Sequence, residues 1–221
     1  MKYTVVVFDL DGTLLYTLED LMDATNYALN RYGYPIRTLT EIRSFVGNGV
    51  RRLMERALPD GAANPNFENI LSAFREYYTA HCEDKTHVYQ GILPLMQQLK
   101  SAGCRMAIVS NKLDSAVKEL SQNYFKDYVQ ATIGEKEGVQ RKPAPDMVEN
   151  VLAGLSCSKK DAVYVGDSDV DIQTAANAGL DCISVSWGFR DADFLRKCGA
   201  SVIVDTPQQI YDLICGAKTT G

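Results

Sequence analysis

The chain has 221 residues, of which 46% are hydrophobic, and a formal net charge of -5. This length and composition suffice for one large globular domain, or for a core that carries an insertion. Because the lysines and arginines form no sustained cluster, we expect neither an extended nucleic-acid surface nor a patch for anionic membranes. An anionic ligand would therefore have to be held by a local pocket.

The cysteines and histidines narrow the class of protein further. The six cysteines are scattered without a C-x-x-C pair, which is typical of reduced residues in a cytoplasmic protein. With only two histidines, a histidine-based zinc site is not expected. The first apolar stretch meets Asp9 too soon for a signal peptide, and no later run is long enough to cross a bilayer.

The first apolar run, residues 3–8, consists of β-branched and aromatic residues and predicts a buried parallel strand. It ends in an acidic turn that contains Asp9 and Asp11. Because residues two apart on an extended backbone point the same way, both carboxylates should lie on one side of the strand end. Two like charges this close favour a bound cation or a shared proton. Taken alone, the two acids fit a merely polar strand end equally well.

Residues 15–88 change to a helical pattern. Apolar residues recur at helical spacing over 18–29, and Thr38 to Glu41 has the spacing of a capping box. A Gly-Asn-Gly sequence at 47–49 interrupts the pattern, and a longer helix follows the turn at 59–65. We expect no strand between Leu15 and Val88. The pattern predicts a helical domain over 15–88, inserted into a core formed by 1–14 and 89–216, with a frayed tail at 217–221.

The remainder of the chain alternates between helices and strands. Expected helices at 92–102, 115–123, 146–155 and 172–178 alternate with expected strands at 105–110, 129–133, 162–166, 182–186 and 201–204, and a terminal helix starts at Thr206. Such repeated units predict an α/β fold, a Rossmann-like parallel sheet with helices on both faces. Ligands of such sheets bind beyond the C-terminal ends of the strands.

Polar residues follow several of these expected strands. Asp167 adds a third carboxylate at the same edge as Asp9, and Asp171, four residues later, shares its helical face. An acidic cluster with no histidine partner suits a hard cation such as Mg²⁺. Ser110 and Lys142 can bind phosphate oxygens there. Each also has a plainer interpretation, as a helix-terminal acid, a helix cap or a surface lysine.

Four segments, taken in order, resemble the motifs of the haloacid-dehalogenase-like hydrolase superfamily: Asp9-x-Asp11-Gly12-Thr13, Ser110-Asn111, Lys142-Pro143 and Gly166-Asp167-x-x-x-Asp171. Within that superfamily the chain is similar to the phosphoglycolate phosphatase group, whose helical cap is inserted after the first motif. Residues 45–51 are similar to the cap loop of that group. Tyr16-Thr17 stands where members commonly carry Asp-Ser, which leaves the cap hinge and the substrate open.

The resemblance implies a role for each motif residue. Asp9 would attack phosphorus and form an aspartyl-phosphate, and Asp11 would act as general acid and then general base. Mg²⁺ would be held by the Asp9 carboxylate, the backbone carbonyl of Asp11 and Asp167. Asp171 would orient the metal shell or Lys142.

The resemblance also implies where the substrate binds. The residues expected to hold the phosphoryl group are Gly12, Thr13, Ser110, Asn111 and Lys142. The cap loop would recognise the leaving group, and Arg51 would bind a carboxylate of the substrate. The residues of this loop are Gly47, Asn48, Gly49 and Arg51. Arg51 equally fits a solvated helix residue.

The sequence therefore predicts a Mg²⁺-dependent cytoplasmic phosphatase that acts on a small phosphorylated metabolite, a phosphoglycolate-like ester or a sugar phosphate. A sugar-phosphate mutase of the same superfamily is the alternative, and a non-catalytic phosphate- or metal-binding regulator is less favoured. Phosphonate hydrolysis is disfavoured because 15–65 contains no lysine. Dehalogenation is disfavoured because it has no use for Asp11. We expect no nucleic-acid or membrane partner; the sequence indicates neither the physiological substrate nor the oligomeric state.

Overall fold

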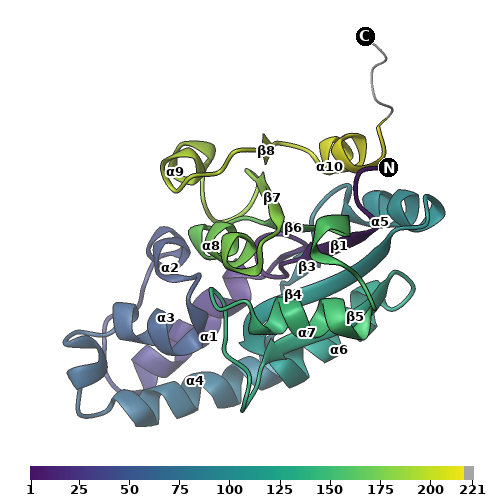
Figure 1. Cartoon of the computed structure of the whole chain (residues 1–221). Coiled ribbons are helices and arrows are strands. Elements are labelled where there is room, and N and C mark those ends of the chain that lie inside the picture. Colours follow the sequence, from purple (N-terminus) through teal and green to yellow (C-terminus); the bar gives the residue numbers. More distant parts are fainter. Residues whose placement is uncertain (217–221) are drawn as a thin grey trace. The chain divides into compact units, whose positions relative to one another are not determined.

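The computed structural model describes residues 1–216, and the predicted tail at 217–221 lies outside the described residues. The chain forms two compact units (Figure 1). One consists of Met1–Leu14 together with the chain from Val88 onward, and the other is Leu15–His87. No helix in the described part of the chain is both long and apolar enough to cross a membrane.

The first unit is built on a six-stranded sheet in the order β5-β4-β1-β6-β7-β8, with every neighbouring pair parallel. The strands are β1 (Val5–Phe8), β4 (Arg105–Leu113), β5 (Val129–Glu135), β6 (Ala162–Gly166), β7 (Asp181–Val185) and β8 (Ile203–Val204). The prediction of a Rossmann-like parallel sheet is confirmed.

Helices cover both faces of this sheet. They are α5 (Ile92–Ser101), α6 (Asp114–Phe125), α7 (Asp146–Gly154), the 3-10 turn η2 (Lys159–Asp161), α8 (Asp169–Ala178), α9 (Ala192–Lys197) and α10 (Pro207–Cys215). Residues of α7 and α8 pack with Val5, Val7 and Tyr164 on one face. The connections through α5 and α6 run across the sheet in the opposite direction, so the right-handed crossover rule places these helices on the other face.

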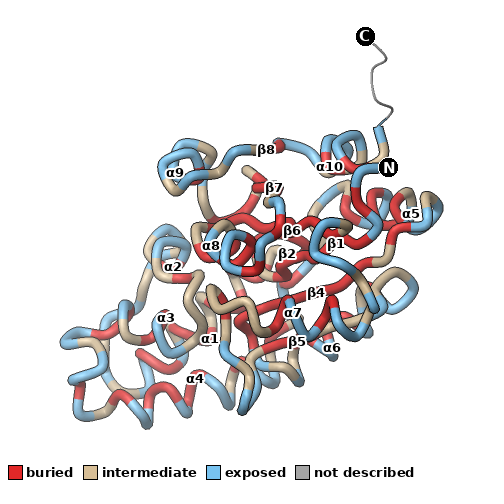
Figure 2. Tube along the Cα trace, viewed as in Figure 1, coloured by how far each residue is buried: buried red, intermediate tan, exposed pale blue. Residues whose placement is uncertain are grey.

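The centre of the sheet is apolar on both faces, because helices cover it on each side. All four residues of β1 are fully buried, and Figure 2 shows β1, β4 and β6 buried along most of their length. Phe8 pairs with Ile108 on β4 and with Val165 on β6. The residues that follow these three strands therefore meet at one edge of the sheet.

The second unit is helical. It contains α1 (Leu18–Arg31), α2 (Leu39–Phe45), α3 (Gly49–Ala57), the 3-10 turn η1 (Gly61–Ala63) and α4 (Phe67–His81). Helices α1 and α4 pack against each other through buried apolar residues such as Leu29 and Phe74. The capping box of α2 forms as predicted, since the Thr38 N–H donates to Glu41 Oε2 at 2.8 Å.

The expectation of no strand between Leu15 and Val88 is wrong. Strands β2 (Leu15–Tyr16) and β3 (His87–Val88) pair as a two-stranded sheet where the chain enters and leaves the helical unit. Two residues are too few for an alternating pattern to be recognised. The centre of the Tyr16 ring lies 5.1 Å from the centre of the His87 ring. Tyr16 belongs to the Tyr16-Thr17 pair that departs from the usual hinge sequence, so this residue has a structural partner in His87.

Helix α9 was also not predicted. It is only six residues long, too short to show a clear apolar period. Its start is fixed locally, because the Asp191 carboxylate accepts a hydrogen bond from the Phe194 N–H at 2.8 Å.

Candidate active site

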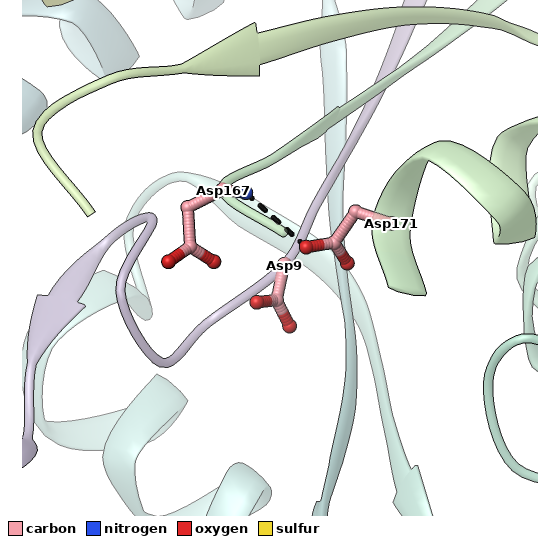
Figure 3. A group of neighbouring side chains, drawn as sticks. All are labelled: Asp9, Asp167 and Asp171. Atoms are coloured by element: carbon pink, nitrogen blue, oxygen red, sulfur yellow. Dashed lines mark hydrogen bonds between the residues drawn. The ribbon is translucent and has the colours of Figure 1, made fainter. Parts of the chain in front are cut away.

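Three carboxylates converge at the C-terminal edge of the sheet. Asp9 directly follows β1, and its N–H donates to the carbonyl of Val165 on β6 at 2.9 Å. Asp167 directly follows β6, and Asp171 lies in the first turn of α8. Asp9, Asp167 and Asp171 each offer an oxygen within 4.8 Å of the other two, and all three residues are buried (Figure 3).

Both oxygens of Asp171 are engaged by other protein groups. Its Oδ2 accepts from the Ser168 hydroxyl at 2.7 Å, from the Ser168 N–H at 3.0 Å and from the Asp167 N–H at 3.2 Å. These are the bonds of a helix N-terminus, so α8 holds the side chain in place. Its Oδ1 accepts from Lys142. Asp9 and Asp167 are therefore better placed than Asp171 to bind an added cation directly.

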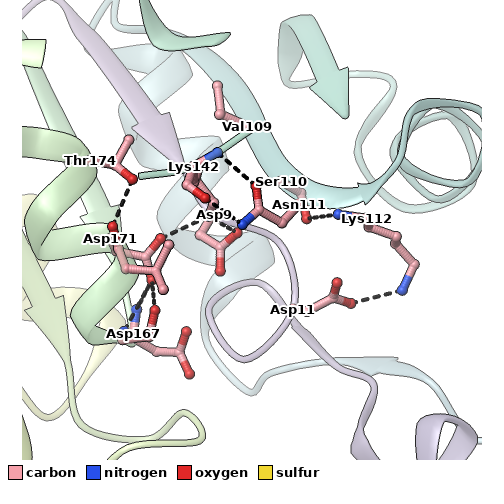
Figure 4. Close-up of polar contacts among 12 residues, drawn as sticks. Asp9, Asp11, Val109, Ser110, Asn111, Lys112, Lys142, Asp167, Asp171 and Thr174 are labelled. Carbon is pink, nitrogen blue, oxygen red and sulfur yellow. Dashed lines mark hydrogen bonds and ion pairs between the residues drawn. The ribbon is translucent and has the colours of Figure 1, made fainter. Parts of the chain in front are cut away.

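Lys142 supplies a buried positive charge to the cluster. Its Nζ lies 2.6 Å from Asp9 Oδ1 and 2.8 Å from Asp171 Oδ1 (Figure 4). Asn111 fixes the lysine backbone, because the Lys142 N–H donates to Asn111 Oδ1 at 2.8 Å and Asn111 Nδ2 donates to the Lys142 carbonyl at 3.0 Å. The Asn111 amide thus serves here to position Lys142.

Tyr164 is a site residue that the sequence interpretation missed. It lies in the middle of β6 and is fully buried, yet its hydroxyl is 3.1 Å from Lys142 Nζ and 3.2 Å from Asp171 Oδ1. The available signal was a single hydroxyl-bearing side chain in an otherwise aliphatic strand, two residues before Gly166. The hydroxyl contacts both members of the ion pair.

The charges of the cluster are unbalanced. Burial raises the pKa of Asp9 well above its usual value, although the Lys142 ammonium opposes this rise. Burial, with the nearby Asp171 carboxylate, raises the pKa of Asp167 to about 7. Burial alone would lower the pKa of Lys142, but the carboxylates of Asp171 and Asp9 outweigh it and raise that pKa. Three buried carboxylates around one ammonium form a hard-oxygen donor set that fits a divalent cation.

Two loops close tightly around Asp167. A Cβ on Gly12 or on Gly188 would overlap the Asp167 side chain, so neither position accommodates a larger residue without rearrangement. Gly12 also has φ of +89°, which favours glycine. The Phe189 N–H donates to Asp167 Oδ2 at 2.6 Å. The segment from Trp187 to Arg190, which the sequence interpretation did not place in the site, therefore forms part of it.

Asp11 is not a member of this carboxylate cluster. Its Oδ1 lies 3.0 Å from Lys112 Nζ, and Figure 4 shows the two side chains as a pair apart from the Lys142 network. The Lys112 side chain is 5% exposed and that of Asp11 is 22% exposed. Lys112 was not predicted as a site residue. The sequence feature that could have identified Lys112 as a site residue is its position directly after Ser110 and Asn111.

The other predicted phosphoryl-binding residues lie in the same compact unit. Ser110 is buried, and its Oγ accepts from the Lys112 N–H at 3.2 Å. Thr13 is also buried; its carbonyl accepts from Trp187 Nε1 at 3.1 Å, whereas its hydroxyl has no hydrogen-bond partner among residues 1–216. The Thr13 hydroxyl is thus a buried polar atom that still lacks a partner.

The predicted cap-loop residues lie in the helical unit and not in the unit that holds the carboxylates. Gly47 and Asn48 precede α3, and Gly49 begins it. Arg51, on the same helix, already has an anionic partner: its Nη2 is 2.6 Å from Glu68 Oε1, and its guanidinium lies 5.0 Å from the centre of the Phe67 ring.

Comparisons with known proteins agree with this fold and site. A family model described as haloacid dehalogenase-like hydrolase matches residues 6–185. The phosphoglycolate phosphatase of Rhodobacter capsulatus is 35% identical over 189 residues, covering 84% of this chain and 85% of the relative. That of Psychrobacter arcticus is 31% identical and covers 98% of each chain. A crystal structure from Lactobacillus delbrueckii subsp. bulgaricus, of a protein provisionally named a phosphoglycolate phosphatase, has a TM-score of 0.94 and 38% identity, covering 98% of this chain and 100% of that one.

The chain belongs to the haloacid dehalogenase-like hydrolase family, which confirms the resemblance inferred from its four motifs. Its curated relatives make it a phosphoric monoester hydrolase. A phosphorylated small molecule is the corresponding class of substrate.

Proposed function

We propose that this enzyme is a Mg²⁺-dependent cytoplasmic phosphatase that hydrolyses a small phosphate monoester through an aspartyl-phosphate on Asp9. The observation that carries the proposal is the position of Asp9, whose Oδ1 lies 2.6 Å from Lys142 Nζ at the edge of the sheet, within a buried carboxylate cluster. Phosphoglycolate is the first substrate to test, because it is the one that the names of the curated relatives give.

The carboxylates of Asp9 and Asp167 would hold the metal ion, together with the backbone carbonyl of Asp11, as the family resemblance implies. When bound, Mg²⁺ neutralises charge on the transferred phosphoryl group. Two observations support this assignment. Both oxygens of Asp171 accept hydrogen bonds from the protein, and the three carboxylates of the cluster outnumber the one ammonium that contacts them among residues 1–216, that of Lys142.

In the first step, a carboxylate oxygen of Asp9 forms a bond to phosphorus while the bond from phosphorus to the ester oxygen breaks. The electron pair of the broken bond stays on the leaving oxygen, which takes a proton from the Asp11 carboxyl group. Lys142, together with Ser110 and the turn at Gly12-Thr13, binds the phosphoryl oxygens, while the Asn111 amide positions Lys142. The Lys142 ammonium also fixes the Asp9 carboxylate as it attacks.

In the second step, Asp11, now a carboxylate, removes a proton from water. The water oxygen bonds to phosphorus, and the bond to the Asp9 oxygen breaks, which regenerates the Asp9 carboxylate and releases phosphate. The partial exposure of the Asp11 side chain, 22%, suits a group that must meet both a leaving group and water. The inserted helical unit would act as the cap that excludes bulk water.

The test is phosphate release from a panel of small phosphate esters, with Mg²⁺ and with a chelator. We expect metal-dependent release that is lost in Asp9→Asn. Asp193→Asn is the matched control, because Asp193 is an exposed residue of α9 whose side chain pairs with Arg196 at 2.7 Å. Trapping of phosphate on Asp9 in the first turnover would identify the intermediate. Absence of release from every ester, with turnover only when a bisphosphate is added, would overturn the proposal in favour of the mutase.

A further inference from the structure

We propose that Lys112 binds a second anionic group of the substrate, so that this enzyme selects phosphate esters bearing a carboxylate next to the ester carbon. The inference rests on the proposed phosphatase function and deepens it by assigning the group that recognises the leaving portion. The observation is the pairing of a buried lysine, directly after Ser110 and Asn111, with Asp11.

The first step of the argument is location. In a carboxymethyl phosphate ester, a single methylene carbon separates the carboxylate from the ester oxygen. The group that binds this carboxylate must therefore lie beside the phosphoryl site. Lys112 continues β4 from Ser110 and Asn111, and its backbone N–H donates to Ser110 Oγ at 3.2 Å. It is thus attached to a predicted phosphoryl-binding segment.

The second step is charge. An ammonium that is 5% exposed is costly without a nearby anion, and in this structure the Asp11 carboxylate provides one at 3.0 Å. The proposed reaction directs Asp11 toward the leaving oxygen, so its contact with Lys112 is weakened at that moment. A carboxylate on the substrate offers the Lys112 ammonium an anion of the same chemistry as the Asp11 carboxylate, whereas a neutral leaving group does not.

The third step compares Lys112 with Arg51, the other residue that could recognise the leaving group. The Arg51 guanidinium is already paired with Glu68 at 2.6 Å and lies over the Phe67 ring, and its side chain is 43% exposed. Both cations have a carboxylate partner, but an exposed cation contributes little to discrimination because solvent screens its charge. Lys112 is buried in the unit that carries Asp9, so its charge is screened less by solvent.

The experiment compares kcat/KM for phosphoglycolate with kcat/KM for its carboxamide, which has nearly the same shape but lacks the carboxylate charge. In the wild type we expect a clear preference for the acid. Lys112→Met should lower the ratio of the two values by about tenfold or more, and Lys112→Arg should restore most of it. A general structural defect would lower both values together and leave the ratio unchanged.

Two matched variants complete the design. Lys118→Met removes an exposed lysine of α6 that pairs with Asp114, and it should leave both values unchanged. Arg51→Met should leave the ratio unchanged; a collapse of the ratio in Arg51→Met but not in Lys112→Met would transfer the role to Arg51 and overturn the proposal. Lys112→Gln serves the same comparison if melting shows that Lys112→Met is unfolded. If the wild type turns over and the ratio is unaltered in Lys112→Met and Lys112→Gln, this inference alone is refuted. If the wild type turns over neither ester, the phosphatase proposal is refuted.

Discussion

The Tyr164 hydroxyl lies 3.1 Å from Lys142 Nζ, the same nitrogen that forms the ion pair with Asp9. With Asp9 and Asp171, it gives the ammonium three oxygen partners, one for each of its N–H groups. The lysine is therefore held in one orientation by groups that come from β1, β6 and α8.

Tyr164→Phe should lower kcat/KM by about fivefold, because one neutral hydrogen bond contributes about 1 kcal/mol to fixing Lys142. The ring remains, so thermal unfolding should change little. Steady-state kinetics of the single variants and of the double variant with Lys142→Ala check the mechanism. If Tyr164 acts through the lysine, it should have no further effect in the double variant; additive losses would contradict this role.

Lys142→Ala should lose much more activity than Ser110→Ala. Two unit charges 4 Å apart at an effective dielectric of about 20 interact by about 4 kcal/mol, whereas a neutral hydrogen bond contributes about 1 kcal/mol. Phosphate release by the two purified variants gives the ranking, and melting curves verify that both are folded. Comparable losses would show that charge on Lys142 is not the dominant contact to the phosphoryl group.

Gly188→Ala should impair activity by at least about tenfold and raise the Mg²⁺ concentration needed for half-maximal rate. The added Cβ would overlap the side chain of Asp167 and the backbone oxygen of Gly12, so the Asp167 carboxylate would have to move. A Mg²⁺ titration of the rate measures the effect. Gly154→Ala is the matched control, because nothing lies within 4 Å of its added Cβ; it should retain full activity.

The stability of the metal-free protein should fall as pH rises from about 4 to about 7. Burial raises the pKa of Asp167 from 3.8 to about 7, so in this window the folded state retains a proton that the unfolded state releases. In the proposed site, Mg²⁺ would bind the ionised carboxylates, so it should stabilise the protein more at pH 7 than at pH 5. Melting temperatures with Mg²⁺ and with a chelator across this range test both statements. A Mg²⁺ effect independent of pH would contradict the assignment of the metal to this cluster.

The sequence pattern predicted a parallel sheet and placed Asp9 and Asp167 at its edge, but it also placed Asp11 beside Asp9, whereas the structure pairs Asp11 with Lys112 outside the cluster. The strand of residues 3–8 and the acids at 9 and 167 could be predicted because a buried parallel strand is a continuous apolar run and its ligands follow its end. The helix of 192–197 and the two-residue strands beside the helical unit could not, because short elements show no clear period.

Two site residues, Tyr164 and Lys112, were not predicted for a different reason. Tyr164 fits the apolar pattern of β6, and only its contact with Lys142, 22 residues earlier, gives its hydroxyl a role. Lys112 is 101 residues from Asp11, so apart from its position directly after Ser110 and Asn111 nothing local distinguishes it from a surface lysine. Such roles follow from the order of the strands, which the sequence pattern did not specify.

Asp9 and Lys142 are in contact although they lie 133 residues apart in the sequence. Strand β1 precedes the inserted helical unit in the chain, and it pairs with β4, which follows that unit. During synthesis, Asp9, the proposed nucleophile, is therefore made long before Lys142. Because these long-range pairings must form together, a partly made chain or an N-terminal fragment has no working centre. Phosphate release would thus directly report complete folding of the core. A chain that terminates before Asp171 would be inactive rather than weakly active.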